Sequence, residues 1–305
     1  MTKKLVSLFL ALVMALSLTA AFAESTAVTV TDMAGREISL DAPATKVVAL
    51  TASDCEILAA LGAEDTLVGR SEYCDYPESI LEVPAVQSGA DTNLEQIIAL
   101  EPQVVIMAKM AQTEEQVAAL EEAGIRVVVS DAQDIEGVYT AIRLIGALVG
   151  RNDEAEVMVA DMQSAFADIA AKSENTGKTV YFEVSPLQWG LWTAGKGTFM
   201  DELATLCGLT NAFADVEGWA EISEEQVLER DPDYIVTISM YYGEGPTPVE
   251  EIKSRAGWEG LKAVQNDAIL NADSNEISRP GPRLKDAAET LYQFVSGDEA
   301  LTPAA

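Results

Sequence analysis

Apolar residues recur at three- and four-residue spacing between Asn152 and Lys172, near the middle of the chain. Charged and polar residues fill the other positions, so a helix built from this segment has one side to bury and one side to expose. We expect Asn152 to cap the first turn and Lys172 to interact favourably with the dipole at the last turn. At ~1.5 Å per residue the helix is a rod of about 30 Å. This predicts a rigid link between two parts of the chain, although a crossover helix inside one large α/β domain has the same periodicity.

Short apolar strands alternate with helices on both sides of this segment. Before it, the pattern predicts strands at residues 46–50, 66–69, 104–108 and 126–129, and helices at residues 54–61, 93–100, 113–123 and 135–149. The same rhythm returns after residue 176. Such alternation is typical of parallel sheets covered by helices. In the first helix, Ser53 and Glu56 have the spacing of a capping box.

Two segments from opposite sides of the long helix align without gaps, residues 93–106 and residues 223–236. Each consists of a helix containing a Glu-Gln pair, an acid-Pro turn and a strand, which favours duplicated lobes. The expected fold class is therefore α/β, with two Rossmann-like lobes joined by a single long helix and a ligand cleft between the lobes. The lobes are expected at residues 24–149 and 176–296, the connecting helix within residues 150–175, and a flexible tail at residues 297–305.

The first 23 residues have the pattern of a signal peptide: Lys3 and Lys4, an apolar run from residue 5 to residue 18, and a small-residue cleavage site ending at Ala23. No cysteine lies near this site to carry a lipid. We therefore expect an exported protein, soluble in the periplasm or on the extracytoplasmic face. An uncleaved membrane anchor is the alternative, but the apolar run is short for one.

The chain is strongly acidic, with a formal net charge of -31. This charge argues against nucleic acid or an anionic membrane as a partner, because both repel a polyanion. It favours a partner that carries basic patches, although acidity also keeps an exported protein soluble. We expect a monomer.

Histidine is absent from the whole sequence. Its absence excludes Ser-His-Asp catalysis, zinc held by histidine and haem held by histidine. The three cysteines, Cys55, Cys74 and Cys207, lack metal-ligand spacing, and whether Cys55 and Cys74 meet is left open by the sequence. Residues 190–197 nearly spell a phosphate-binding loop, but Gly197 stands where a Ser or Thr is needed for magnesium. We expect no catalytic residues, no bound metal and no cofactor, although the ligand itself could contain cobalt or iron.

Several aromatic residues follow predicted strands in the second half of the chain, where open α/β sheets bind ligands. These residues are Trp189, Trp192, Trp219, Tyr241 and Tyr242. We therefore expect them to face a cleft, and burial in the core is the alternative.

Five segments of the chain together resemble one known family, the substrate-binding proteins of ABC importers for cobalamin and ferric siderophores. The segments are Thr-Leu-Val-Gly-Arg-Ser-Glu-Tyr-Cys-Asp-Tyr-Pro at 66–77, Asn-Leu-Glu at 93–95 with Pro102, Gly-Lys-Gly-Thr-Phe at 195–199, Glu-Glu-Gln-Val-Leu at 224–228 and Arg-Pro-Gly-Pro-Arg at 279–283. The resemblance covers nearly all of the chain after residue 23. It implies two α/β lobes joined by one long helix, and the Tyr-x-Asp-Tyr-Pro loop leans toward the cobalamin branch.

The resemblance also implies a function and a set of site residues. The protein would capture a corrinoid between its lobes and deliver it to an ABC permease dimer, with Tyr73, Trp192, Trp219 and Arg279 contacting the ligand. A ferric siderophore or haem is the alternative ligand. Aromatic faces can cover a broad corrin ring, and an arginine can meet its amide or phosphate oxygens. The protein would not be an enzyme.

Two functions outside this family remain as alternatives. An exported hydrolase could use paired carboxylates as acid and base, although the chain has neither histidine nor a Gly-x-Ser-x-Gly elbow. A purely structural surface protein would have no closed cleft and no small-molecule ligand.

Glu95 and Glu225 occupy the same place in the repeated helix. In two lobes related by a pseudo-twofold axis they would project from matching surfaces, and the resemblance implies that each pairs with arginines in a basic docking pocket of the permease. The alternative is that both glutamates only interact with the dipole at a helix start.

Overall fold

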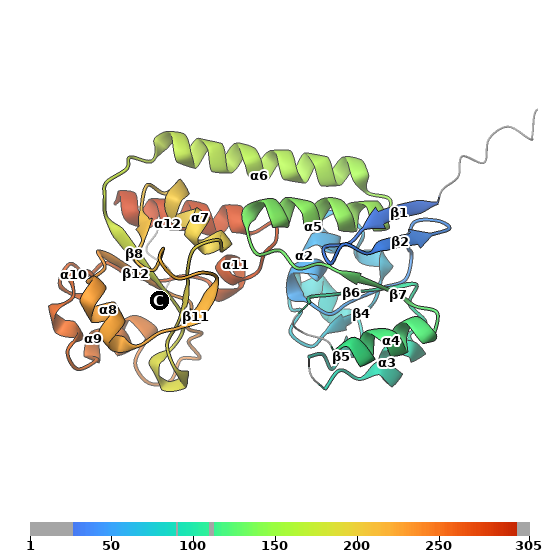
Figure 1. Ribbon diagram of the computed structural model, residues 1–305, viewed down its shortest axis with the longest axis horizontal. Helices are drawn as coiled ribbons and strands as arrows, with labels where there is room; N and C mark the ends of the chain where they lie inside the picture. Colours follow the sequence, from blue (N-terminus) through green and yellow to red (C-terminus); the bar gives the residue numbers. More distant parts are fainter. Residues whose placement is uncertain (1–26, 90, 110–112, 298–305) are drawn as a thin grey trace, which may run out of the picture.

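Two β-sheets, one from each half of the chain, form the cores of two lobes that lie side by side beneath a long helix (Figure 1). The computed structural model describes residues 27–89, 91–109 and 113–297. The long helix is α6 (Asn152–Lys172), and it spans both lobes along one edge of the molecule. This confirms the expected α/β fold with two lobes.

The sheet of the N-terminal lobe is parallel throughout, with the strand order β5-β4-β3-β6-β7. Its strands are β3 (Val47–Ala49), β4 (Leu67–Ser71), β5 (Ala85–Val86), β6 (Val104–Met107) and β7 (Arg126–Val129). Helices α2 (Ala52–Ala60), α3 (Leu94–Ala99), α4 (Glu114–Glu122) and α5 (Ile135–Leu148) connect them, with short 3-10 turns η1 (Glu64–Thr66) and η2 (Glu78–Glu82). A hairpin of β1 (Val28–Thr31) and β2 (Glu37–Leu40) precedes the sheet. Successive strand residues enter different apolar clusters, such as Val47 on one face and Val48 on the other, so both faces are buried.

The sheet of the C-terminal lobe is mixed. Strands β8 (Thr179–Ser185), β12 (Tyr234–Thr237) and β13 (Ile269–Asn271) are parallel, and β10 (Thr210–Asn211) pairs with β8, whereas β9 (Trp192–Ala194) and β11 (Trp219–Glu221) extend the sheet in antiparallel pairing. The helices are α7 (Phe199–Leu206), α8 (Glu224–Arg230), α9 (Pro248–Ser254), α10 (Lys262–Gln265), α11 (Ser274–Ser278) and α12 (Leu284–Ser296), with turns η3 (Leu187–Trp189) and η4 (Trp258–Gly260). The two antiparallel strands depart from the parallel sheet that alternation predicted.

The sequence repeat reappears in the backbone. Helix α3 leads into β6, and α8 leads into β12, at equivalent places in the two lobes. In both cases the acid before proline has a positive φ, 50° at Glu101 and 44° at Asp231. Few non-glycine residues adopt this conformation, so its presence at both places supports duplicated lobes.

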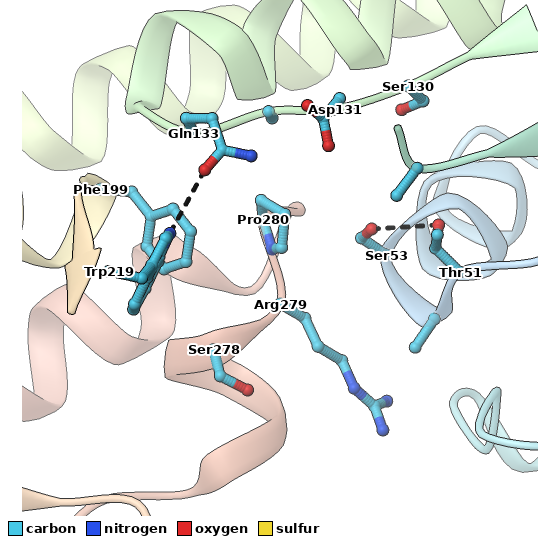
Figure 2. Close-up of a pocket in the computed structure, with 13 residues that line it drawn as sticks. Thr51, Ser53, Ser130, Asp131, Gln133, Phe199, Trp219, Ser278, Arg279 and Pro280 are labelled. Atoms are coloured by element: carbon cyan, nitrogen blue, oxygen red, sulfur yellow. Dashed lines mark hydrogen bonds between the residues drawn. The ribbon is translucent and has the colours of Figure 1, made fainter. Parts of the chain in front are cut away.

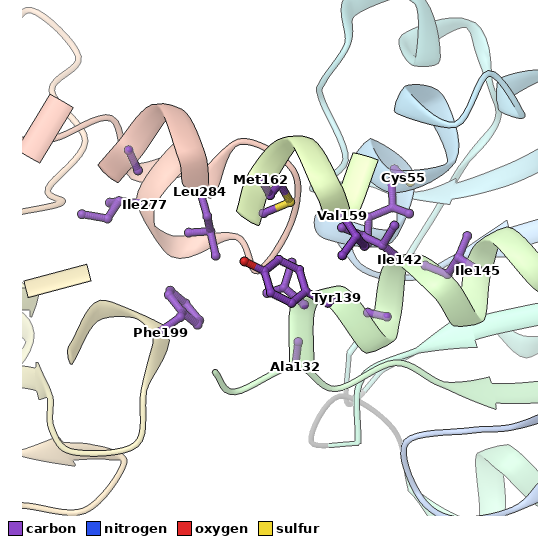
Figure 3. Close-up of a cluster of buried hydrophobic side chains, with 14 of the residues drawn as sticks. Cys55, Ala132, Tyr139, Ile142, Ile145, Val159, Met162, Phe199, Ile277 and Leu284 are labelled. Atoms are coloured by element: carbon purple, nitrogen blue, oxygen red, sulfur yellow. The ribbon is translucent and has the colours of Figure 1, made fainter. Parts of the chain in front are cut away.

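One apolar cluster runs through both lobes by way of α6. The buried face of α6, with Val159, Met162 and Phe166, packs against α5 of the first lobe and α12 of the second (Figure 3). Val47 of the first sheet and Val180 of the second belong to the same cluster. The helix is therefore a shared part of both cores.

Two of the local predictions are wrong. Asn152 is the first residue of α6, and the cap position belongs to Arg151, which makes no side-chain cap hydrogen bond. Helix α2 is capped by Thr51, whose Oγ1 accepts from the backbone N–H of Asp54 at 3.4 Å, so Ser53 and Glu56 form no capping box. Glu56 instead lies buried, where its carboxylate binds two arginines of the other lobe.

The two lobes are joined by ion pairs between this carboxylate and the segment between α11 and α12. Arg283 donates to both oxygens of Glu56, from Nε at 2.8 Å and from Nη2 at 2.7 Å, and its guanidinium lies 4.1 Å from the ring centre of Tyr76. Arg279 donates from Nη1 to Glu56 Oε1 at 2.9 Å and to Asp75 Oδ1 at 2.7 Å. We call these four charged residues, Glu56, Asp75, Arg279 and Arg283, the interlobe ion cluster. The side chain of Glu56 is 2% exposed, so removing either arginine would leave a buried carboxylate short of a partner.

The three cysteines are buried free thiols. Cys55 and Cys74 are neighbours but form no disulfide, and the thiol of Cys74, together with burial, raises the pKa of Cys55. The predicted signal peptide, and all of the predicted tail except Gly297, lie outside the described residues. Within the described ranges, no helix is both long and apolar enough to cross a membrane.

We expect Gly146→Val to destabilise the protein by about 1–3 kcal/mol, because α5 and α6 approach closely at this residue. A Cβ at Gly146 would lie 2.7 Å from the Cβ of Ala155 and 2.9 Å from the carbonyl oxygen of Arg151. Urea unfolding measures the change. The matched control is Ala167→Val, on the exposed side of α6, and an equal loss in the two variants would contradict close packing at Gly146.

We expect Glu56→Gln to cost about 3–5 kcal/mol, because it leaves two partly buried guanidinium groups short of a charged partner. The matched control is Glu156→Gln, since Glu156 is also held by two hydrogen bonds from one arginine, Arg143, but in an exposed pair. That pair should contribute about 0–1 kcal/mol. Urea unfolding of both variants compares the losses, and equal losses would show that the interlobe ion cluster does not stabilise the lobe contact.

Candidate functional site

A cavity of about 360 Å³ lies between the two lobes (Figure 2). From the N-terminal lobe it is lined by Thr51, Ala52, Ser53, Ala108, Ser130, Asp131, Ala132 and Gln133, and from the C-terminal lobe by Phe199, Trp219, Ser278, Arg279 and Pro280. Residues from both halves of the sequence are therefore needed to form it.

The topology of the sheet explains the N-terminal wall. Strands β3, β6 and β7 are parallel neighbours, and their carboxyl ends lie at one edge of the sheet. The lining residues follow these ends directly, at residues 51–53, at Ala108 and at residues 130–133. Ligands of open α/β sheets bind outside this edge.

Two aromatic rings form much of the C-terminal wall. Trp219 packs on Phe199 with ring centres 5.3 Å apart and planes tilted by 58°. The indole Nε1 of Trp219 donates to Oε1 of Gln133 at 3.2 Å, and this hydrogen bond crosses from one lobe to the other. The cavity thus offers an aromatic face whose Trp219 ring is held by Phe199 in its own lobe and by Gln133 in the other.

The N-terminal wall is polar. It presents the hydroxyl groups of Thr51, Ser53 and Ser130 and the carboxylate of Asp131. Behind this surface lies Asp54, which is fully buried and accepts a hydrogen bond from the hydroxyl of Thr51. Burial raises the pKa of Asp54 to about 6, against the opposing effect of the hydroxyl groups of Thr51 and Ser130.

The structure brings together two of the four residues expected to contact a ligand. Trp219 and Arg279 line the cavity, whereas Tyr73 and Trp192, which are 68% and 40% exposed, do not line it. Arg279 is already bound to Glu56 and Asp75. Burial alone would lower its pKa, but the hydrogen bonds to these two carboxylates raise it.

Sequence reasoning missed Gln133, Asp131 and Phe199. Asp131 and Gln133 could have been found, since they follow the end of a buried strand at the ligand-binding edge. Phe199 carries no such signal, because it reaches the cavity as the first residue of α7.

The lining groups can make hydrogen bonds and aromatic contacts to a ligand. Among the described residues there is no group of three or more His, Cys, Asp or Glu side chains that could hold a metal ion. The cavity combines hydroxyls, one carboxylate, one paired guanidinium and aromatic rings, which suit a partly apolar ligand with polar groups at its edge.

Glu95 and Glu225 do not line this cavity, and they belong to different lobes. Each is the second residue of its helix, after the caps Asn93 and Ser223, and each is exposed. The hydroxyl of Ser223 lowers the pKa of Glu225. Figure 1 shows α3 at the end of its lobe remote from α6, and α8 on the outer side of the other lobe.

Comparison with known proteins gives one consistent result. A family described as periplasmic binding protein matches residues 47–276. The uncharacterized ABC transporter substrate-binding lipoprotein YvrC of Bacillus subtilis (strain 168) is 32% identical over 278 residues, which cover 89% of this chain and 86% of that protein. The vitamin B12-binding protein of Salmonella typhi is 31% identical over 259 residues, covering 83% of this chain and 91% of that protein.

Solved structures agree with these relatives. The periplasmic vitamin B12-binding protein BtuF of Vibrio cholerae superposes with a TM-score of 0.71 at 25% identity, covering 85% of this chain and 99% of that one. The periplasmic heme-binding protein HutB of Vibrio cholerae has a TM-score of 0.75 at 21% identity, covering 82% and 98%, and shows a shared fold. From the two lobes, the cavity between them and these matches, we conclude that the chain belongs to the periplasmic binding protein family.

Proposed function

We propose that this protein is the extracytoplasmic solute-binding component of an ABC importer, and that it carries a corrinoid to the permease. The observation that carries the proposal is the cavity between two lobes, at the carboxyl ends of three parallel strands. A relative similar over nearly the full length is described as an ABC transporter substrate-binding lipoprotein, which supports the importer.

The choice of a corrinoid is supported by two facts. One relative, in Salmonella typhi, is described as a vitamin B12-binding protein, and the match covers 91% of its length. The paired rings of Trp219 and Phe199 provide an aromatic face of the kind that covers a broad, partly apolar ring. Ferric siderophores and haem remain the alternative ligands, and haem would need an iron ligand other than histidine.

A hydrolytic role is less well supported. Acid–base hydrolysis of a glycoside needs two carboxyl groups that flank the scissile bond. Of the described residues, Asp131 supplies the one carboxylate that lines the cavity. We therefore propose a binding protein rather than an enzyme, with no cofactor of its own.

The protein is proposed to act as a monomer outside the cytoplasm. The signal-peptide pattern that ends at Ala23 supports export. The Bacillus subtilis relative is named a lipoprotein, whereas this chain has no cysteine near residue 23, so we propose a soluble form.

The test of the ligand is direct. Wild-type protein incubated with dicyanocobinamide or cyanocobalamin should elute from gel filtration as a coloured one-to-one complex. Trp219→Ala should weaken the complex by at least about tenfold, because aromatic stacking contributes roughly 1–3 kcal/mol. Trp219→Phe keeps a ring on Phe199 and loses the hydrogen bond to Gln133, so it should recover most of the affinity.

If both corrinoids fail to bind and a ferric siderophore binds tightly, the proposed ligand is wrong. The proposed importer role would still stand. If Trp219→Ala and the wild type bind the corrinoid with equal affinity, the aromatic wall does not contact the ligand.

Docking to the permease is proposed to use Glu95 and Glu225. The supporting observation is their equivalent, exposed position at the second residue of α3 and α8, which suits a partner with twofold symmetry. Carboxylate–arginine pairs at such a surface govern orientation and encounter rate, and they weaken in salt.

Changing both residues, in a Glu95→Lys, Glu225→Lys protein, should leave ligand affinity unchanged and abolish importer-dependent uptake. The matched control is Glu115→Lys with Glu250→Lys, which reverses two exposed glutamates near the starts of α4 and α9. Uptake of labelled ligand into cells or proteoliposomes measures the effect. If the Glu95→Lys, Glu225→Lys protein supports as much uptake as the control at physiological salt, the two glutamates have no docking role and only interact with the dipoles of their helices.

A further inference from the structure

We propose that the charges around the cavity make it selective for uncharged or cationic chelates over anionic ones, with Asp131 and the interlobe ion cluster as the specificity determinants. This inference rests on the proposed function, since it assumes that the cavity holds a chelate. It adds which chemical class of chelate enters.

The first observation concerns Arg279, which lines the cavity but is not available to an anion. Its Nη1 donates to both Glu56 and Asp75, and its Nη2 lies 3.4 Å from the carbonyl oxygen of Tyr73. The interlobe ion cluster contains two arginines and two carboxylates, so its formal charges cancel. A ligand carboxylate could bind Arg279 only by displacing one of these partners, and displacing Glu56 would leave a buried carboxylate with one arginine fewer.

The second observation concerns Asp131, the other charged residue on the described cavity wall. Among the described residues its carboxylate has no hydrogen bond or ion pair, and its backbone N–H donates to Sδ of Met33. Figure 2 shows Asp131 projecting from its loop into the space that Pro280 and Arg279 close from the other side. Its charge is therefore presented to whatever occupies the cavity.

The third observation is a second carboxylate behind the first. Asp54 is fully buried beneath Thr51 and Ser130, and burial raises its pKa to about 6, so it carries a negative charge only above that pH. Buried charges are poorly screened, so the ionised form of Asp54 adds to the negative potential of this wall. Lys109 follows Ala108 near the cavity but is exposed and does not line it.

Together, the paired Arg279 and the carboxylates of Asp131 and Asp54 disfavour an anion in the cavity. A carboxylate or catecholate group near Asp131 would meet like charge and lose its hydration without gaining a free cation. A primary amide at the same place would gain, because its N–H groups can donate to Asp131. Corrinoids with amide side chains, and neutral ferric hydroxamates, satisfy this condition. Haem, with its propionates, and ferric tris-catecholates do not.

The test uses two matched pairs of probes. Dicyanocobinamide and cyanide-ligated cobyrinic acid share the corrin ring and differ in amide against carboxylate side chains. A ferric tris-hydroxamate and a ferric tris-catecholate share the metal and differ in net charge. For each pair, the selectivity is the dissociation constant of the anionic probe divided by that of the uncharged or cationic one, measured by tryptophan fluorescence.

In the wild type we expect a selectivity of at least about tenfold for whichever pair binds. Asp131→Asn should reduce this selectivity by about threefold or more. The double variant Asp131→Asn, Asp75→Asn should reduce it further, because Asp75→Asn also removes one carboxylate partner of Arg279. The matched control Asp168→Asn removes an exposed charge from α6 and should leave the selectivity at the wild-type value.

The outcomes separate the two proposals. If the wild type binds none of the four probes, the proposed function fails, and the charge selectivity fails with it. If the wild type binds an anionic probe as tightly as its partner, the function stands and this inference is overturned. Equal changes in Asp131→Asn and Asp168→Asn would also overturn it, because the effect would then come from net charge alone.

Discussion

The structure depends on the apolar face of α6, which is buried in both lobes at once. Ala155 and Val159 pack toward the first lobe, and Phe166 and Ile169 continue the same cluster toward the second. Moving one lobe relative to the other would expose part of this face or break helical hydrogen bonds. The relative position of the lobes, and hence the width of the cavity, is therefore set by core packing as much as by contacts across the cleft.

The contacts across the cleft are polar, and they differ in kind from those along α6. Glu56 binds two arginines, and Trp219 donates to Gln133. Hydrogen-bonded contacts of this sort fix geometry more strictly than apolar packing does, because they require particular atoms at particular distances. The cavity is thus bounded on one side by a shared core and on another by directional bonds.

Local pattern was enough to predict α6, the strand–helix alternation and the duplicated α3 and α8 segments, since each depends on residues near one another in sequence. The resemblance to a known family supplied Trp219 and Arg279. The role of Glu56 could not be predicted, because its partners are 223 and 227 residues away and its spacing from Ser53 imitates a capping box. Strands β9 and β11, of three residues each, were missed because their pairing is non-local and their length leaves no periodic signal.

The shared carboxylate of Glu56 has a consequence for the exchange of parts between related proteins. A chimera that joins this N-terminal lobe to a foreign C-terminal lobe places Glu56 opposite whatever residues stand at the positions of Arg279 and Arg283. Without two cations there, the carboxylate remains buried and unpaired, a penalty that an otherwise well-formed lobe cannot offset locally. The two lobes are separate in architecture, but substitutions at these three positions are coupled across most of the length of the chain.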